Sequence, residues 1–372
     1  MLMSSRSGTV FVSEPQVSVD ALVPIYPSQY YYDHKCAYKF VLSRADNVVA
    51  LPATPRMELG TIIHLLHHWS FLNRGVGVTL PQAEQKFDEL VADTERRLSA
   101  SPLSALLVPL SSSCDVYVTR RHSAVRHAVR EPSAKGTGGT RGARQLSEEG
   151  IESSDGLIKG SMDAVYFSGD AIDVIDRKSG DVTRDGVLRE SYVTQLKLYA
   201  GLIYDVEGIM PRSLALIDGA FHRYEVDFTP DEVIALYSAA KEWLGAIREE
   251  VSSRPGNLAS LADPRPSNCK NCQLRPNCRP YWEAARQGAQ GYPMDFASTV
   301  ETIEALPNNS YIIRFGGYDR SLSFRIKQAQ LSAYKQTLDQ LKKGDRIFIM
   351  NAIMGGRQIE VEAQTVILID RR

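Results

Sequence analysis

Two aspartates and a lysine in the middle of the chain have the types and spacing needed to bind a metal ion. Residues 157–167 and 171–177 are two runs of apolar and polar residues, and a glycine-containing break between them suits a tight turn. We therefore predict a β-hairpin. Residues two apart in a strand share a face, so Asp176 and Lys178 point the same way, and Asp163 on the paired strand comes alongside them.

This arrangement of charges indicates a metal site. Two carboxylates held together repel each other unless a cation lies between them, and hard divalent ions such as Mg²⁺ prefer oxygen ligands. A lysine beside such a site would orient a water nucleophile or offset charge that develops on a phosphate. That is the chemistry of metal-assisted phosphodiester hydrolysis. The alternative is a surface hairpin with scattered charges, which is the commoner origin of an isolated D-x-K triplet.

A cysteine cluster forms a second group with chemical potential. Cys269, Cys272 and Cys278 have the spacing C-x2-C-x5-C, which supplies three ligands where a tetrahedral site needs four. The fourth ligand must come from elsewhere in the chain, and Cys36 and Cys114 are the candidates. Five cysteines spread in this way argue against a disulfide framework.

Composition places the chain among ordinary globular proteins. With 372 residues and 43% apolar content, it can bury at least one large core, and we expect two domains. No apolar run approaches the roughly 18 residues that span a bilayer, and the first residues lack a signal-peptide pattern, so we expect a cytoplasmic protein. The net charge of −1 gives no global attraction to nucleic acid, so any basic surface must be local.

Several predicted elements would position these groups. Residues 57–72 read as a helix that carries His64, and residues 191–208 as a helix that places Gln195 and Tyr199 on one face. Two further strands are expected over residues 213–219 and 221–228. A strong helix should follow Thr229, which has the pattern of a capping box.

Two other segments have a less direct link to the hairpin. Residues 131–150 are rich in Gly, Ser and Thr and should form a flexible loop. Just before this loop is a basic run that we interpret as a solvated face; its members are Arg120, Arg121, Arg126 and Arg130.

The last 80 or so residues change character. Five strand-like runs with one helical run between the third and the fourth predict a small closed barrel of the OB type. Tyr311, Ile313 and Phe315 share one strand face and should be barrel core. The exposed candidates for nucleic-acid binding are Arg314, Tyr318, Arg320, Arg325 and Lys327. A barrel that docks a protein partner is an equally good reading of this pattern.

Taken in chain order, the motifs resemble the PD-(D/E)XK nuclease superfamily. The similar branch is the RecB-like one with an iron–sulfur cluster, which includes the CRISPR-adaptation nucleases and the AddB nuclease domain. The resemblance covers residues 28–282, apart from Ala37, which stands where the family has proline. The matching motifs are Ser28 to Cys36, Gly60 to His64, Gly160 to Asp163, Asp176 to Lys178, Gln195 with Tyr199, and the cysteine triplet.

The resemblance implies an α/β fold, with a restriction-endonuclease-like core and a helical insertion ahead of the C-terminal all-β barrel. The implied domains are an arm over residues 1–23, the nuclease domain over 24–290 and the OB-like domain over 291–372. His64, Asp163, Asp176 and the main-chain carbonyl of Arg177 would hold Mg²⁺ or Mn²⁺. Lys178 would activate water or stabilise the phosphate, and Gln195 and Tyr199 would position the DNA strand.

The resemblance also selects Cys36 as the fourth cysteine of a 4Fe-4S cluster that clasps both ends of the nuclease domain. Zinc is the alternative, because it is the usual occupant of a C-x2-C pattern. The implied activity is a DNA nuclease, with single-stranded or free DNA ends as substrate, in genome defence or recombination repair, and with a helicase as a potential partner. The rival from another class is a catalytically silent DNA-binding or scaffold subunit that keeps the nuclease fold. DNA versus RNA, cleavage polarity and oligomeric state stay open.

Overall fold

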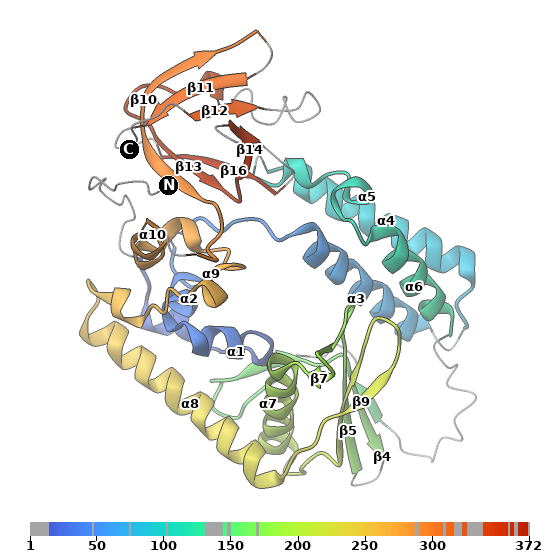
Figure 1. The fold of residues 1–372 in the computed structure, drawn as a ribbon. Helices are drawn as coiled ribbons and strands as arrows, with labels where there is room; N and C mark the ends of the chain where they lie inside the picture. The colour runs from blue at the N-terminus through green and yellow to red at the C-terminus, as the bar shows by residue number, and fades with distance from the viewer. Residues whose placement is uncertain are drawn as a thin grey trace.

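A computed structural model describes most of the chain, namely residues 15–46, 48–73, 76–101, 103–130, 144–146, 150–168, 171–286, 290–307, 310–315, 322–325, 338–355, 358–360 and 364–370. Helices and a central sheet form the larger part, and a second sheet lies at one end (Figure 1). The mixed α/β class predicted from the sequence is confirmed. The predicted flexible loop over 131–150 lies mostly outside the described residues.

The helices fall into two groups by position. The first half of the chain supplies α1 (Pro27–Lys35), α2 (Ala37–Leu42), α3 (Pro55–Asn73), α4 (Leu80–Ser99), α5 (Leu110–Ser113) and α6 (Tyr117–Arg130). The second half supplies α7 (Glu190–Glu207), α8 (Pro230–Ser253), α9 (Pro266–Cys269) and α10 (Arg279–Arg286). The predicted capping box is confirmed. The Thr229 hydroxyl accepts a hydrogen bond from the Glu232 amide, and the Glu232 carboxylate accepts one from the Thr229 amide.

The central sheet has five strands in the order β1-β4-β5-β8-β9. These strands are β1 (Arg144–Leu146), β4 (Ala164–Ser168), β5 (Ala171–Arg177), β8 (Ser213–Ile217) and β9 (Arg223–Glu225). The predicted hairpin is confirmed as the antiparallel pair β4–β5, and the second predicted strand pair as β8–β9. β5 and β8 are parallel and are joined through α7, whose buried face covers one side of the sheet.

Two small sheets flank the central one. β2 (Gly150–Glu152) pairs with β3 (Lys159–Ser161), and β6 (Thr183–Arg184) pairs with β7 (Val187–Leu188). The first run of the predicted hairpin is therefore not one strand. It divides at a bend that contains Met162 and Asp163, and this bend separates β3 from β4.

The C-terminal part contains one seven-stranded sheet in the order β14-β15-β12-β11-β10-β13-β16. Its strands are β10 (Phe296–Ala305), β11 (Ser310–Phe315), β12 (Leu322–Arg325), β13 (Arg346–Met350), β14 (Ile353–Gly355), β15 (Gln358–Glu360) and β16 (Val366–Asp370). The prediction of five strands was too low. Asn351 has a φ of 54° and turns the chain between β13 and β14, so the fourth predicted run divides in two. The fifth run divides into β15 and β16, and the first half of the predicted helix, residues 331–337, lies outside the described residues.

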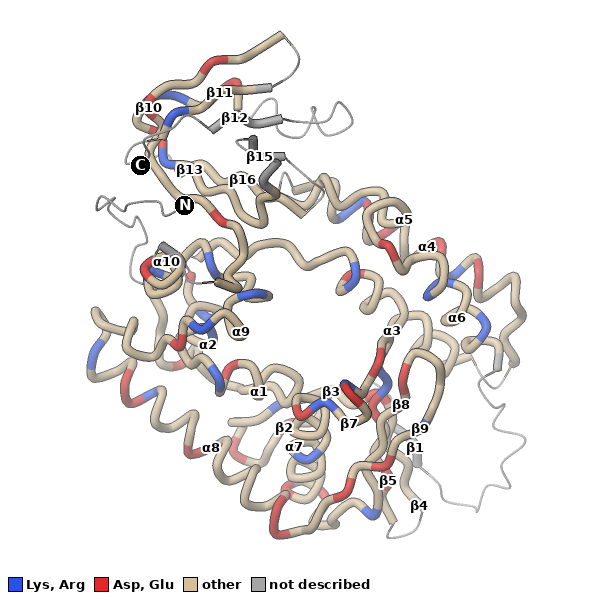
Figure 2. Tube along the Cα trace, viewed as in Figure 1, with Lys and Arg blue, Asp and Glu red and all other residues tan. Residues whose placement is uncertain are grey.

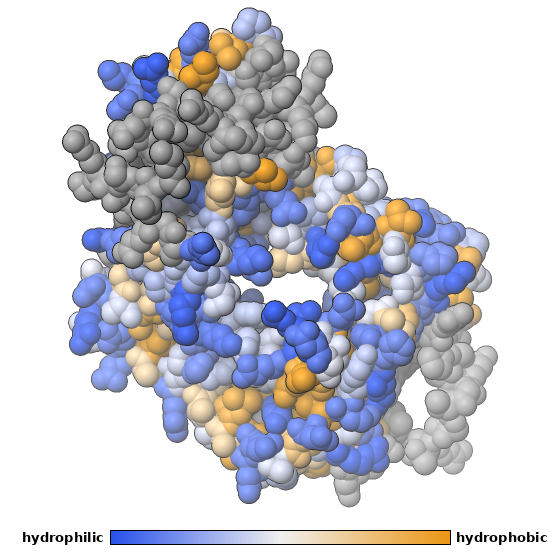
Figure 3. Space-filling model, viewed as in Figure 1, coloured by the Kyte–Doolittle hydropathy of each residue, from blue (hydrophilic) through white to orange (hydrophobic). Residues whose placement is uncertain are grey.

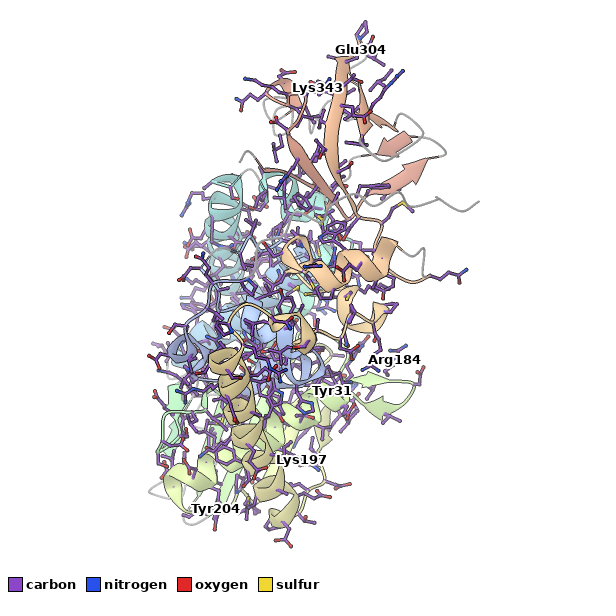
Figure 4. The ribbon with its side chains drawn as sticks, turned by 90° about the vertical axis from the view of Figure 1, so that its left-hand side faces the viewer. Tyr31, Arg184, Lys197, Tyr204, Glu304 and Lys343 are labelled. Atoms are coloured by element: carbon purple, nitrogen blue, oxygen red, sulfur yellow. The ribbon has the colours of Figure 1, made fainter. Side chains whose placement is uncertain are left out.

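The two parts share a buried contact. Phe348 and Val366 of the C-terminal sheet belong to the same apolar core as Trp282 of α10, and the rings of Trp282 and Phe348 are 5.8 Å apart. In the side view, Glu304 and Lys343 mark the outer end of the C-terminal sheet, and Lys197 and Tyr204 lie toward the opposite end of the molecule (Figure 4). The described end of the predicted N-terminal arm also packs here: Leu22 is fully buried in this core.

Charges are distributed without a dominant sign. Lys and Arg alternate with Asp and Glu along the described chain (Figure 2), in keeping with the net charge of −1. In the described part of the chain, no helix is both long enough and apolar enough to span a membrane.

Candidate active site

The end of β5 brings the predicted carboxylates together. Ala164 of β4 pairs with Ile175 of β5 in an antiparallel register. Asp163, just before Ala164, and Asp176, just after Ile175, therefore come alongside each other. The Arg177 amide donates a 2.6 Å hydrogen bond to Oδ2 of Asp163, which fixes that carboxylate against the end of β5. The hairpin register therefore places both carboxylates at the same end of the β4–β5 pair, as the alternation of residues predicted.

Lys178 joins the two sides of this site. Its Nζ lies 2.7 Å from Oδ2 of Asp176 and 2.9 Å from Oε1 of Gln195. Its main-chain amide continues the pairing of β5 with β8 through a 2.8 Å bond to the carbonyl of Ile217. The ammonium also lies over the ring of Tyr192, 4.8 Å from the centroid. A long, flexible side chain is thus held in one place by three partners, and its backbone by a fourth.

Helix α7 provides the groups that support the site. Gln195 Nε2 donates to Oδ1 of Asp176 at 3.1 Å and to the Tyr199 hydroxyl at 3.3 Å. The Tyr199 hydroxyl donates to the carbonyl of Ser161 at 2.8 Å. Gln195 and Tyr199 are four residues apart, so one buried helix face presents both. Helix α7 is therefore connected by hydrogen bonds to the end of β3, just before Asp163, and to Asp176 at the end of β5.

His64 of α3 reaches the site from the other side. Its Nδ1 lies 3.7 Å from Oδ1 of Asp163, and its side chain is 34% exposed. Burial lowers the pKa of His64, but the contact with Asp163 outweighs burial and leaves this pKa above its usual value. The imidazole thus faces a carboxylate across a gap that is too wide for a short hydrogen bond.

The carboxylates have opposite pKa shifts because their partners differ. Burial raises the pKa of Asp176, and the negative charge of Asp163 adds to this effect, so the net shift is upward although Lys178 opposes it. Burial also raises the pKa of Asp163, but His64 and the Arg177 amide outweigh it, and the net shift is downward. Burial lowers the pKa of Lys178, but Asp176 outweighs burial and raises it, which keeps the ammonium charged.

The donor set suits a hard divalent cation. It combines the buried carboxylate of Asp176, the half-buried carboxylate of Asp163, an imidazole and the main-chain carbonyl of Arg177, and oxygen-rich sites of this kind favour Mg²⁺ or Mn²⁺. Burial raises the pKa of Asp176, so a cation next to this carboxylate would favour its charged form. In the described part of the chain, no three His, Cys, Asp or Glu side chains stand close enough together to hold one ion. The carboxylates and His64 would therefore have to move closer together to bind a cation.

Gly160 of β3 lets the Tyr199 ring lie against the backbone. A Cβ at this position would be 2.6 Å from Cε1 of Tyr199, which is closer than real contacts allow. We expect Gly160→Ala to lower the free energy of unfolding by about 1–3 kcal/mol, as overpacking does, and to pull Tyr199 away from Ser161. Gly150→Ala in the paired strand β2 is the matched control, because its Cβ would meet nothing within 4 Å. Equal thermal midpoints for the two variants would contradict this prediction.

Four of the five cysteines gather at one place. Cys36 lies between α1 and α2, and its sulfur accepts a bond from the Asp263 amide at 3.5 Å, next to the segment that carries the cysteine triplet. Burial raises the pKa of Cys269 to about 12, and the nearby Cys272 and Cys36 add to the shift. Cys114 lies in the separate core of α3, α4 and α6. Among the two candidates for the fourth cysteine, the structure brings Cys36 to the triplet.

The predicted nucleic-acid residues of the C-terminal part are described only in part. Arg314 in β11 is exposed, between Ile313 and Phe315, which are buried, so the predicted alternation is confirmed there. Arg325 lies in β12, but its side chain is not described. Tyr318, Arg320 and Lys327 lie outside the described residues. Of these five side chains, the structure therefore describes that of Arg314 alone.

The basic run of α6 includes a residue that the sequence interpretation missed. Arg121 is half-buried against α4, where it pairs with Asp88 and lies over the ring of Phe87, so this part of the run is not a fully solvated face. Arg120 instead turns inward, and its NH1 donates a 3.3 Å hydrogen bond to Oγ of Ser179, next to Lys178. The helical offset of 100° between neighbours was the only signal for this difference, and the sequence alone does not say which face packs.

The chain was compared with known proteins. A protein-family model described as the PD-(D/E)XK nuclease superfamily matches residues 27–279, which is more than half of the chain. The search of curated proteins gives no match.

Proposed function

The chain belongs to the PD-(D/E)XK nuclease superfamily, and from this premise we propose that it is an Mg²⁺- or Mn²⁺-dependent deoxyribonuclease that hydrolyses phosphodiester bonds. Members of this superfamily are generally metal-dependent nucleases. The observation that carries the proposal is the buried contact of Lys178 with both Asp176 and Gln195, beside Asp163. A surface hairpin with scattered charges would not hold these side chains together by hydrogen bonds.

In this proposal, each residue has a distinct task. Asp163, Asp176, His64 and the main-chain carbonyl of Arg177 hold the divalent ion, which when bound supplies a Lewis acid next to the phosphate. The Lys178 ammonium orients the attacking water or offsets charge on the phosphate. Gln195 and Tyr199 keep Lys178 and Asp176 in place and brace the strand-binding face.

We propose further that the substrate is single-stranded DNA with a free end, cut exonucleolytically. The space-filling view supports a path for a single strand, because an opening with a hydrophilic rim passes through the molecule in the region of α1, α3 and α9 (Figure 3). A setting in genome defence or recombination repair, with a helicase that feeds the strand, rests on family resemblance to the RecB-like branch.

The C-terminal sheet supports the proposal of an OB-like barrel over residues 291–372, next to a nuclease domain over 24–290. β12 pairs with β15 in parallel, and β16, which follows β15, pairs with β13. The described strands pair in the order β14-β15-β12-β11-β10-β13-β16, with β14 and β16 at the two ends, and we propose that this strongly paired sheet curls into the barrel. The barrel would bind DNA through Arg314 and its neighbours or dock a protein partner.

We propose that Cys36, Cys269, Cys272 and Cys278 bind a 4Fe-4S cluster, with zinc as the alternative. The choice of a cluster rests on the family resemblance and on the cysteine pattern, because one distant cysteine with a compact triplet differs from the two-knuckle pattern of zinc sites. We expect the anaerobically purified protein to be brown and to contain iron. A colourless protein with one zinc per chain would contradict the cluster.

Cleavage of end-labelled nucleic acids tests the proposed function. Single- and double-stranded DNA and RNA, each linear, would be incubated with Mg²⁺, Mn²⁺ or a chelator, and circular single-stranded DNA would serve as the substrate without ends. We expect metal-dependent loss of linear single-stranded DNA, and no loss of the circle. Binding of DNA without cleavage under every condition would favour the scaffold subunit instead.

A further inference from the structure

The chain directly after Lys178 is enclosed by three elements. Ser179 and Gly180 follow the end of β5, and α3, α6 and the loop between β8 and β9 meet around them (Figure 1). The space left among these elements is about 20 Å³, which suits a single water molecule and not a nucleotide. The side chains at this junction therefore act on the proposed active site through the protein.

Glycines allow the neighbouring elements to approach Ser179 closely. A Cβ on Gly219, in the β8–β9 loop, would lie 2.8 Å from the carbonyl oxygen of Ser179, and the Gly219 amide donates to the carbonyl of Gly180 at 3.3 Å. A Cβ on Gly60 of α3 would lie 3.1 Å from Oγ of Ser179. The backbone and the side chain of Ser179 thus each have a close neighbour, with little room to shift.

Helix α6 bonds to Ser179 and to the loop that packs on it. NH1 of Arg120 donates to Oγ of Ser179 at 3.3 Å, and Gly180 makes room for the guanidinium, because a Cβ there would lie 2.8 Å from NH2 of Arg120. Ser123, three residues after Arg120 and so on the same helix face, donates to the carbonyl of Gly219 at 3.0 Å. One face of α6 therefore holds the side chain of Ser179 directly and its backbone through the loop.

The β8–β9 loop is itself fixed by Asp218. Oδ1 of this buried carboxylate accepts hydrogen bonds from the amides of Ala220 and His222 at 2.8 and 2.9 Å. Oδ2 accepts one from the Tyr224 hydroxyl at 3.1 Å. The loop thus provides a firm surface on the side of Ser179 that α6 does not contact.

The position of Ser179 sets the direction of two groups of the proposed active site. Lys178 is the residue before it, and the carbonyl of Arg177 lies one residue further back. The Lys178 amide is held on β8 by a 2.8 Å bond to the carbonyl of Ile217, so the contacts of Ser179 fix the other end of the same short segment. A misplacement of about 1 Å at such a site can lower the rate about 100-fold.

We propose that Arg120 is a positioning residue of the nuclease site. Through Ser179 it holds the end of β5 so that the Arg177 carbonyl faces the divalent ion and the Lys178 ammonium faces the phosphate. This inference rests on the proposed nuclease function and extends the site to α6, beyond the D-x-K hairpin and α7. Arg120 contacts neither the metal ion nor the DNA in this proposal.

Steady-state cleavage of linear single-stranded DNA with Mn²⁺ tests the proposal. Arg120→Met removes every donor and retains the apolar stem, and Arg126→Met, at an exposed position of the same helix, is the matched control. We expect Arg120→Met and Ser179→Ala each to lower kcat about 10- to 100-fold without a change in KM, and Arg126→Met to change neither.

The double variant shows whether Arg120 acts through Ser179. If it does, Arg120→Met combined with Ser179→Ala should lose no more activity than either single variant, because both remove the same contact. Losses that multiply in the double variant would overturn the proposal. A higher KM for Arg120→Met with kcat unchanged would also overturn it, because that result indicates direct contact with DNA.

Metal binding separates this proposal from the proposed function. Calorimetric titration with Mn²⁺ alone requires no cleavage, and we expect Arg120→Met and Ser179→Ala each to weaken binding about 10-fold or more, with thermal midpoints close to that of Arg126→Met. If DNA is cleaved but Arg120→Met keeps the kcat and the Mn²⁺ affinity of the unaltered protein, the positioning role is wrong and the nuclease stands. If no nucleic acid is cleaved but both variants weaken Mn²⁺ binding, the nuclease proposal fails and the role of Arg120 at the metal site remains.

Discussion

Replacement of Lys178 by alanine is expected to abolish metal-dependent cleavage while the fold persists. The ammonium lies between Asp176 and Gln195, and the raised pKa of Lys178 keeps it charged at neutral pH. Without it, the water and the phosphate lose their positive neighbour in a buried site, where a single such contact contributes about 100- to 1,000-fold in rate. Cleavage of end-labelled single-stranded DNA at saturating Mn²⁺ measures the effect.

Two further variants make this result interpretable. Lys159→Ala removes a lysine of β3 whose side chain is 47% exposed and whose partner is Glu152, so its cleavage rate should equal that of the unaltered protein. Asp176→Asn retains the shape of the side chain and removes its charge, and it should lose activity to the same extent as Lys178→Ala. Undiminished cleavage by either site variant, with a far-ultraviolet circular dichroism spectrum like that of the unaltered protein, would exclude this site.

Replacement of Asp295 by alanine is expected to lower the free energy of unfolding by about 3–5 kcal/mol, because it leaves a buried guanidinium unpaired. Arg275 and Asp295 form a 2.8 Å ion pair, and their side chains are 3% and 0% exposed. Asp295 also accepts bonds from the Tyr281 hydroxyl at 2.7 Å and from the Asn351 amide at 2.7 Å. One carboxylate thus holds α10 and the turn after β13 together.

The same ion pair reaches the cysteine segment. NH1 of Arg275 donates to the carbonyl of Cys272 at 2.8 Å, and NH2 donates to Oδ1 of Asn351 at 2.5 Å. We therefore expect Asp295→Ala to loosen the triplet and the C-terminal sheet together, so that limited proteolysis releases the sheet. Urea unfolding followed by tryptophan fluorescence gives the change in free energy.

An exposed ion pair nearby provides the control for Asp295. Arg279 and Glu283 are 2.8 Å apart on α10, with side chains 57% and 52% exposed, and such pairs contribute about 0–1 kcal/mol. Glu283→Ala should therefore shift the urea midpoint only slightly. Similar midpoints for Glu283→Ala and Asp295→Ala would show that the buried network does not stabilise the junction of the two parts.

Local patterns in the sequence were sufficient to predict that the carboxylates lie together and which helix residues support them. Alternation in a strand fixes that Asp176 and Lys178 share a face, and a spacing of four fixes the same for Gln195 and Tyr199 in α7. The capping box at Thr229 was predicted for the same reason, because it involves only residues within one helical turn. Each of these relations depends on covalent geometry and backbone period, which short stretches of sequence contain.

Other features depended on contacts between distant segments. Nothing in the local sequence of Arg275 or Asp295 distinguishes them from surface charges, and only the packing of α10 against the C-terminal sheet buries both. The split of the fourth predicted strand depends on the turn at Asn351, whose amide is held by Asp295, 56 residues earlier. Residues this far apart in the chain produce no repeating pattern in the sequence from which their contact could be predicted.

The sequence by itself determined which residues of the D-x-K hairpin and of α7 can act together, because strand and helix periods orient neighbouring side chains. Tertiary structure alone decided that Arg120 reaches Ser179 beside Lys178 while Arg121 packs on α4 and pairs with Asp88, because α6 can present either side until its neighbours pack against it. It also brought Cys36 to a triplet more than 200 residues away, next to Asp263. Burial and charge pairing across the fold, rather than local period, select those partners.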